Sequence, residues 1–223
     1  MPSSSQTAPV RAAGAAAVAA GVAAVTTRLT RWNNRGFTLL EVLLAGAILA
    51  TVLSMSVPLT TSALDEMRTS MAARYLEDRI MNARMLAVKR SASVALRFEA
   101  VGRGYAIAEY ADGNGNGVRS AEIAAGIDPP LAPRQLLHEQ FPAVVFGLRA
   151  NVPDIDGARS TADSDGVRVG SSRILTLGPD GTATPGTLYV HGRRGQFAVR
   201  VLGATGRTRV FRFDSGTGRW IAR

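Results

Sequence analysis

The strongest hydrophobic pattern in the chain is an apolar run over residues 42–64 that contains no charged side chain. As a helix, these 23 residues would be about 35 Å long, enough to cross a hydrocarbon core of about 30 Å. Three arginines precede the run, Arg28, Arg31 and Arg35, and Asp65 follows it directly. Because basic flanks stay on the cytoplasmic side, the pattern predicts one membrane span with the remainder of the chain beyond the membrane.

A helical period continues past the apolar run as far as about Arg90. Neither Gly nor Pro interrupts residues 59–101, and apolar residues recur at spacings near three and four. These recurring positions are Leu64, Met67, Met71, Tyr75, Leu76, Ile80 and Ala83. Such spacing is typical of an amphipathic helix. We therefore expect one helix of about 50 residues that runs from the membrane into the aqueous phase and is covered there by the rest of the chain.

The remainder of the chain has the pattern of strands and turns. Alternating apolar residues predict a hairpin over residues 93–99 and 104–110. Residues 111–170 are rich in Gly, Asp, Asn and Pro, with one expected strand at 143–149. Four further strands are expected at 173–177, 187–191, 197–202 and 208–213. The predicted fold class is α+β, with one long helix packed on an antiparallel sheet.

Composition narrows the functional classes. The 223 residues suffice for one ordinary domain and a membrane segment. The chain has no cysteine, which excludes disulfides and thiol catalysis, and its two histidines do not suit a His-rich zinc site. No nucleophile elbow, P-loop or dinucleotide-binding motif follows a predicted strand. We expect a protein that is not an enzyme and needs no cofactor.

The sequence Gly36-Phe37-Thr38-Leu39-Leu40-Glu41-Val42 stands directly at the start of the apolar run. A carboxylate inside a membrane costs at least about 2.5 kcal/mol at the bilayer centre. Glu41 therefore calls for a partner of positive charge. Cleavage before Phe37 would create an ammonium group at a new N-terminus, and a second copy alongside could offer that ammonium to Glu41.

This segment resembles the prepilin processing site of type IV pilins and type II secretion pseudopilins. The resemblance implies that a prepilin peptidase cuts between Gly36 and Phe37 and methylates Phe37, and that Glu41 serves in docking with other subunits. It also implies a pilin-like fold whose long N-terminal helix is transmembrane in its first half. The expected divisions are a cytoplasmic leader at 1–36, a transmembrane and assembly helix at 37–64, its periplasmic half at 65–92 and a β-rich domain at 93–223.

Shorter segments resemble the GspH/FimT group of minor pseudopilins and minor pilins. They are residues 83–90 at the helix end, residues 174–181, the Gly-Thr-Leu at 186–188, and Gly206-Arg207. This resemblance implies a minor pseudopilin of a type II protein secretion system, held in the inner membrane and assembled with other pseudopilins in a periplasmic pseudopilus. The alternatives are a FimT-like minor type IV pilin, which would serve pilus biogenesis or DNA uptake, and a generic pilin-fold subunit.

Two further segments suggest ligands. Asp112, Asn114 and Asn116 alternate with glycines like the start of a calcium loop, although Ile123 stands where the bidentate Glu should be. An ordinary surface loop explains them better, because Asn-Gly and Asp-Gly pairs commonly form turns.

Near the C-terminus, Arg207, Arg209 and Arg212 lie close to Phe211, Phe213 and Trp220 in a basic stretch. The pattern suits the phosphates and bases of DNA. A solvated strand face, or a surface that docks on acidic sister subunits, explains the stretch better.

Overall fold

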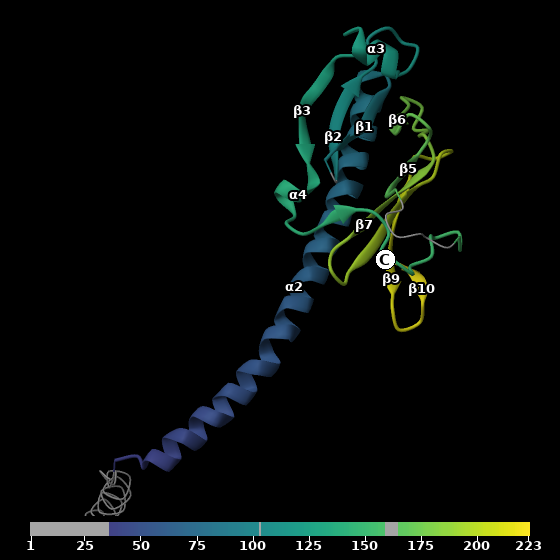
Figure 1. Cartoon of the computed structure of the whole chain (residues 1–223). Coiled ribbons are helices and arrows are strands. Elements are labelled where there is room, and N and C mark those ends of the chain that lie inside the picture. The colour runs from purple at the N-terminus through teal and green to yellow at the C-terminus, as the bar shows by residue number, and fades with distance from the viewer. Residues whose placement is uncertain (1–35, 103, 159–164) are drawn as a thin grey trace, which may run out of the picture. The chain divides into compact units, whose positions relative to one another are not determined.

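The expected long helix is present. A computed structural model describes residues 36–102, 104–158 and 165–223, except for the side chains of residues 55–60. Helix α2 (Leu39–Arg90) is continuous over 52 residues (Figure 1), and Pro58 does not end it. The predicted leader at 1–36 lies outside this description apart from Gly36.

The β-rich part forms two antiparallel sheets, where the sequence predicted one. The first has four strands in the order β3-β2-β1-β6. Their bounds are β1 (Val94–Val101), β2 (Gly104–Ala111), β3 (Pro130–Leu136) and β6 (Ile174–Leu177). The predicted hairpin is confirmed, since β1 and β2 pair from Val94↔Ala111 to Val101↔Gly104.

The second sheet has six strands, in the order β10-β9-β8-β7-β4 with β5 also paired to β7. These strands are β4 (Val145–Phe146), β5 (Val167–Val169), β7 (Gly186–His191), β8 (Gln196–Val201), β9 (Thr208–Asp214) and β10 (Arg219–Ala222). Two short helices, α3 (Ser120–Ala124) and α4 (Leu137–Gln140), flank β3 along the chain. Helices α3 and α4 and strands β3, β5 and β10 were missed by the sequence analysis.

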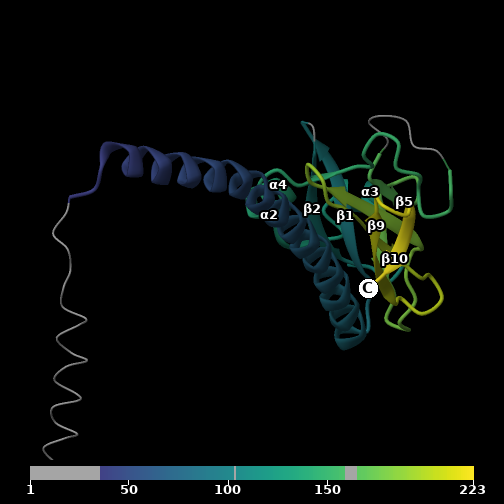
Figure 2. The same ribbon diagram turned by 90° about the horizontal axis from the view of Figure 1, so that it is seen from below.

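One face of α2 joins both sheets in a common core. Its buried residues are Thr69, Ala72, Ala73, Leu76, Ile80, Ala83 and Ala87. The apolar members of this set pack with buried side chains of β1, β2 and β6 in the first sheet and of β4, β5, β7, β8 and β9 in the second. Figures 1 and 2 both show the C-terminal part of α2 alongside β1. Four of these seven residues are alanines, which let the strands approach the helix closely.

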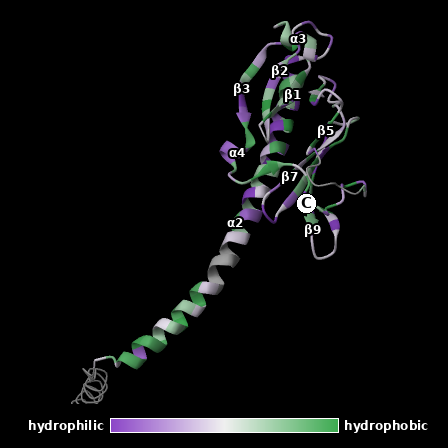
Figure 3. Ribbon diagram, in the orientation of Figure 1, coloured by the Kyte–Doolittle hydropathy of each residue, from purple (hydrophilic) through white to green (hydrophobic). Residues whose placement is uncertain are grey.

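The chain divides into two compact units, Met1–Ser54 and Met55–Arg223. In the first, every described side chain from residue 36 to residue 54 is exposed. Most of these residues are apolar, as the green colour of this part of α2 shows in Figure 3. Within the described part of the chain, no helix combines the length and apolarity needed to cross a membrane. The predicted span at 42–64 includes residues 55–60, whose side chains are not described, and it stays a prediction.

Asp65 fastens the turn between β7 and β8 to α2. Its carboxylate accepts hydrogen bonds from the backbone N–H groups of Arg193 (2.8 Å), Arg194 (2.7 Å) and Gly195 (3.1 Å). A Cβ atom on Gly192 would lie 2.5 Å from Oγ1 of Thr69 and 2.6 Å from Oδ1 of Asp65. The turn therefore approaches the helix so closely that only glycine fits.

Neutralising Asp65 should weaken this joint. Burial of the carboxylate opposes its ionisation, but the three N–H donors outweigh burial and hold the pKa of Asp65 below its ordinary value. We expect Asp65→Asn to lower the free energy of unfolding by about 1–2 kcal/mol near neutral pH, because the neutral amide keeps one accepting oxygen in place of two and its NH₂ group cannot accept from a backbone N–H.

The stabilisation by the Asp65 carboxylate should depend on pH. A carboxyl group with a lowered folded-state pKa stabilises the fold above its unfolded-state pKa, and this contribution is lost as the pH falls through the folded value. Chemical denaturation of the full chain in mild detergent at about pH 6 and about pH 3 would test it. The difference between wild type and Asp65→Asn should shrink at the lower pH, and an equal difference at both would contradict the role of the charge.

Candidate processing and assembly site

Thr38 caps the N-terminus of α2. The backbone N–H of Glu41 donates to Oγ1 of Thr38 at 3.3 Å, and the backbone carbonyl of Thr38 accepts from Glu41 and Val42 at 3.0 and 3.2 Å. A Thr followed three residues later by Glu is the spacing of a capping box. The sequence analysis missed this function, although the Thr-x-x-Glu spacing could have indicated it. The helix therefore begins two residues after the predicted cleavage point.

Glu41 occupies the first turn of α2, where the positive end of the helix dipole favours a negative charge. Its side chain is exposed. Among residues 36–102, 104–158 and 165–223, the Glu41 carboxylate forms no ion pair. The carboxylate is thus held at the helix start and is accessible to a positive group from outside the described chain.

The fold itself does not require glycine at position 36. A Cβ atom built there would meet nothing within 4 Å, and the residue does not adopt a left-handed conformation. Phe37 is 81% exposed. The Gly36–Phe37 junction is therefore accessible to another molecule. If glycine is required at position 36, the requirement comes from a molecule that binds there and not from the packing of this chain.

Comparison with family models identifies this segment. Residues 33–57 match the model of the prokaryotic N-terminal methylation motif. The chain carries the processing motif of type IV pilin-like proteins. The motif includes Gly36, Phe37 and Glu41, and it implies processing by prepilin peptidase and assembly with other pilins. Comparison with curated proteins and with solved structures gave no match, so the GspH/FimT assignment stays a prediction.

Three of the short GspH/FimT-like segments meet in space. Arg84 from the helix end lies against the turns that contain Gly181 and Gly206. A Cβ atom on Gly206 would be 2.5 Å from the carbonyl oxygen of Gly181 and 3.1 Å from Nε of Arg84. Both glycines have positive φ, +85° and +58°. Residues about 100 positions apart in sequence therefore form one packed contact that tolerates no side chain at position 206.

The loop at Asp112 uses its polar groups internally. The Asp112 carboxylate accepts from the N–H groups of Asn114 (3.1 Å), Gly115 (2.7 Å) and Gly117 (2.7 Å). The amide groups of Asn114 and Asn116 donate to Glu122 at 3.2 and 2.7 Å. In the described ranges, no group of three or more His, Cys, Asp or Glu is arranged to hold a metal ion. The geometry fits the interpretation as a hydrogen-bonded surface loop.

The C-terminal arginines do not share one face of the sheet. Arg209 is exposed on β9, whereas Arg212, an odd number of residues later, points to the opposite face and pairs with Glu66 of α2. Arg207 precedes the strand and is exposed. Phe211, Phe213 and Trp220 pack in a small cluster around Tyr189. The arginines of the expected DNA-binding surface thus lie on two faces of the sheet, and its aromatic residues are partly buried.

Proposed function

We propose that the protein is a minor pseudopilin of a type II protein secretion system. In this proposal, prepilin peptidase removes residues 1–36, the segment 37–64 anchors the subunit in the inner membrane, and the two-sheet unit lies in the periplasm. The mature chain is then a structural subunit of the pseudopilus. No catalytic step is assigned to it.

The observation that carries the proposal is the geometry at the start of α2. An accessible Gly36–Phe37 junction precedes a capped helix, and the carboxylate in the first turn of this helix has no ion-pair partner among the described residues. The matched motif covers all of these residues. The exposed apolar side chains that follow require an apolar environment, which a bilayer or neighbouring helices would supply.

The assignment to the H-type pseudopilins is supported by the contact of Arg84 with Gly181 and Gly206. A generic filament subunit would not need this combination, because turns elsewhere in such a domain can use other residues. A FimT-like minor type IV pilin would share both the processing motif and this contact. Its DNA-binding form gains no support from the divided arginines.

Deleting the gene and measuring the enzymes secreted into the medium tests the proposed system. We expect secretion to fall strongly and to return when the wild-type gene is supplied on a plasmid. Normal secretion together with lost twitching or DNA uptake would contradict the secretion assignment and favour the minor type IV pilin.

A further inference from the structure

The turn between β7 and β8 presents two exposed arginines beside the end of the apolar run. Residues 192–195 form this turn, and the side chains of Arg193 and Arg194 at its tip are both exposed. Asp65, the first charged residue after the run, accepts hydrogen bonds from the backbone N–H groups of both. Because the main chain makes this joint, the two guanidinium groups are not used in it. Across the described ranges, neither of them forms an ion pair.

Two more arginines adjoin this turn. Arg149 donates from Nη1 to the backbone carbonyl of Arg194. Arg68 lies three residues after Asp65 on α2, a spacing that brings two side chains of a helix close together. Neither arginine is paired with a carboxylate of the described residues, and the charge of Asp65 offsets only a part of the positive charge. We call this group the basic turn surface, and its members are Arg68, Arg149, Arg193 and Arg194.

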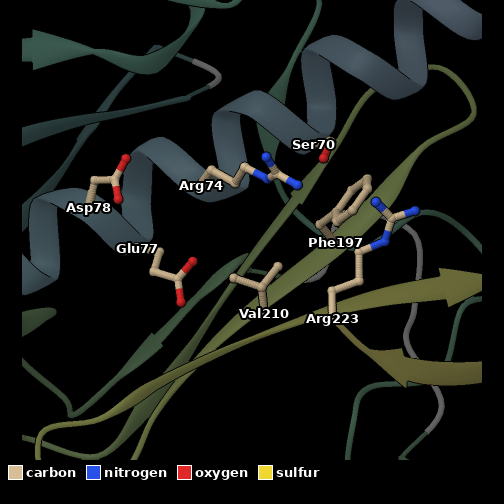
Figure 4. A pocket seen from close by; sticks show the side chains of 7 residues that line it. All are labelled: Ser70, Arg74, Glu77, Asp78, Phe197, Val210 and Arg223. Atoms are coloured by element: carbon tan, nitrogen blue, oxygen red, sulfur yellow. The ribbon is translucent and has the colours of Figure 1, made fainter.

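The charges next to this surface are balanced. Arg212 of β9 pairs with Glu66, the residue after Asp65. Farther along α2, the groove between the helix and the second sheet contains charges of both signs (Figure 4). Its charged residues are Arg74, Glu77, Asp78 and Arg223. The basic turn surface differs from this groove because it has an excess of one sign, which suits a partner of negative charge.

The end of the apolar run determines what lies next to this surface. If residues 42–64 span the membrane, as the proposed function requires, their helix of about 35 Å exceeds the hydrocarbon core by about 5 Å. Asp65 and the turn bound to it then lie in the headgroup layer, which is about 5–7 Å deep on each side of the core. Anionic headgroups attract basic residues within about one Debye length, which is about 10 Å at about 0.1 M salt.

We propose that the basic turn surface docks on anionic phospholipid headgroups and holds the domain against the membrane. This docking rests on the proposed function, because it requires that residues 42–64 anchor the chain. Each guanidinium group can donate two parallel hydrogen bonds to phosphate oxygens. The joint at Asp65 fixes the turn in advance, which lowers the entropy cost of docking. The acidic surface of another protein would match the charge as well, but headgroups surround Asp65 whenever the run spans a bilayer.

The absence of cysteine from the sequence allows a single fluorescent label at a chosen position of the full chain. The labelled chain is reconstituted in bilayer discs of phosphatidylcholine, either alone or mixed with the anionic lipid phosphatidylglycerol. Both kinds of disc contain a small fraction of a neutral lipid that carries a nitroxide on its headgroup. Quenching of the fluorescence by the nitroxide then measures how close the label lies to the headgroups.

Two label positions are compared. Ala150→Cys is exposed next to Arg149 and reports on the basic turn surface. Ala204→Cys is exposed in the β8–β9 turn, at the other end of β8, and is the distant control. That turn also contains Gly206, which lies against Arg84. Arg84 is 19 residues beyond the Asp65 joint, or about 28 Å along α2.

We expect the label at position 150 to be quenched at least about twofold more strongly with phosphatidylglycerol than without it. Salt at about 1 M should abolish this difference, because the Debye length is then about 3 Å. The label at position 204 should be quenched weakly in both kinds of disc. Equal quenching at position 150 with and without phosphatidylglycerol would overturn the proposal and favour an acidic protein as the partner of the arginines.

A pair of arginine variants tests the basic turn surface itself. Arg193→Ser with Arg194→Ser should remove the effect of phosphatidylglycerol and leave the free energy of unfolding unchanged, because Asp65 binds backbone groups of the turn. Arg207→Ser with Arg209→Ser lowers the net charge equally in an exposed region elsewhere and should retain the effect. An equal loss in the two variants would contradict docking through the β7–β8 turn.

Elution of the chain with the discs separates the docking from the proposed function. If the chain elutes with the discs and both lipid compositions give equal quenching, the docking alone fails. If the chain does not elute with the discs, residues 42–64 are not an anchor, and the proposed function and the docking fail together.

Discussion

Replacing Glu41 by alanine should leave cleavage before Phe37 intact and reduce incorporation into the filament at least about tenfold. The Glu41 carboxylate is exposed in the first turn of α2 and has no ion-pair partner within the described residues. In a dry helix bundle an unpaired carboxylate is costly, whereas pairing with the N-terminal ammonium of a neighbour would offset that cost. We therefore expect the loss of this pair to reduce assembly. Sheared filament fractions, probed for the tagged subunit and compared with its membrane level, give the measurement.

Two substitutions separate docking from helix capping. Glu41→Gln removes the charge but keeps a side chain that can reach back to the helix start, as in a capping box. If Glu41 docks through its charge, Glu41→Gln should fail like Glu41→Ala, and Glu41→Asp should retain part of the function. Wild-type incorporation of Glu41→Gln would contradict the charge-pairing role.

Replacing Gly36 by valine should block processing, so that the precursor accumulates at its full length. A Cβ atom at this position meets nothing within 4 Å, so the substitution does not disturb the chain's own packing. We expect the loss because the peptidase must bring its catalytic groups close to the backbone of the Gly36–Phe37 bond. Immunoblots of membrane fractions, which resolve precursor from mature chain, would measure the ratio of the two forms.

Gly46→Val is the matched control for this experiment. Gly46 lies in the same matched segment, and its Cβ position is equally open. A precursor with Gly46→Val should be cleaved normally. If Gly36→Val is cleaved as fast as Gly46→Val, the cleavage point assigned to Gly36–Phe37 is wrong.

The long helix could be predicted because its signals are local. The absence of Gly and Pro over residues 59–101 and the three-to-four spacing predicted one helix, which the structure confirms from Leu39 to Arg90. From the same spacing we expected all of these apolar residues to lie on one helix face that the rest of the chain covers. Met67 and Met71 are exposed, however, whereas Leu76 and Ile80 belong to the core. Hydrophobicity alone does not tell which of two apolar faces the domain covers.

The second sheet and strand β3 were harder to foresee. Strand β3 contains Pro130 and Pro133 and lies in a region rich in turn-forming residues, but it is an edge strand, where a missing N–H is tolerated. It is also held by α2, since Tyr75 and Arg79 both donate to Oε1 of Gln135, at 2.5 and 3.1 Å. Contacts of this kind join distant segments and leave no local pattern in the sequence.

The residues of the candidate site could be predicted from the sequence, whereas contacts between segments far apart in the chain could not. Gly36, Phe37 and Glu41 stand within one short segment whose resemblance to a prepilin processing site marked them, and the matched residues 33–57 include all three. The joint between Asp65 and the β7–β8 turn spans about 130 residues and needed the structure. The separation of Arg209 from Arg212 could have been foreseen, because a strand was expected at 208–213 and residues three positions apart on a strand point to opposite faces. Only the pairing of Arg212 with Glu66 of α2 needed the structure.

The N-terminus of the mature protein shows whether the chain is a processed, pilin-like subunit. Mass spectrometry of the protein purified from membranes should find an N-terminal peptide that begins at Phe37 and carries one methyl group on its α-amino nitrogen. If the main form is a peptide that reads through the intact Gly36–Phe37 bond, the chain is not processed as a pilin-like subunit.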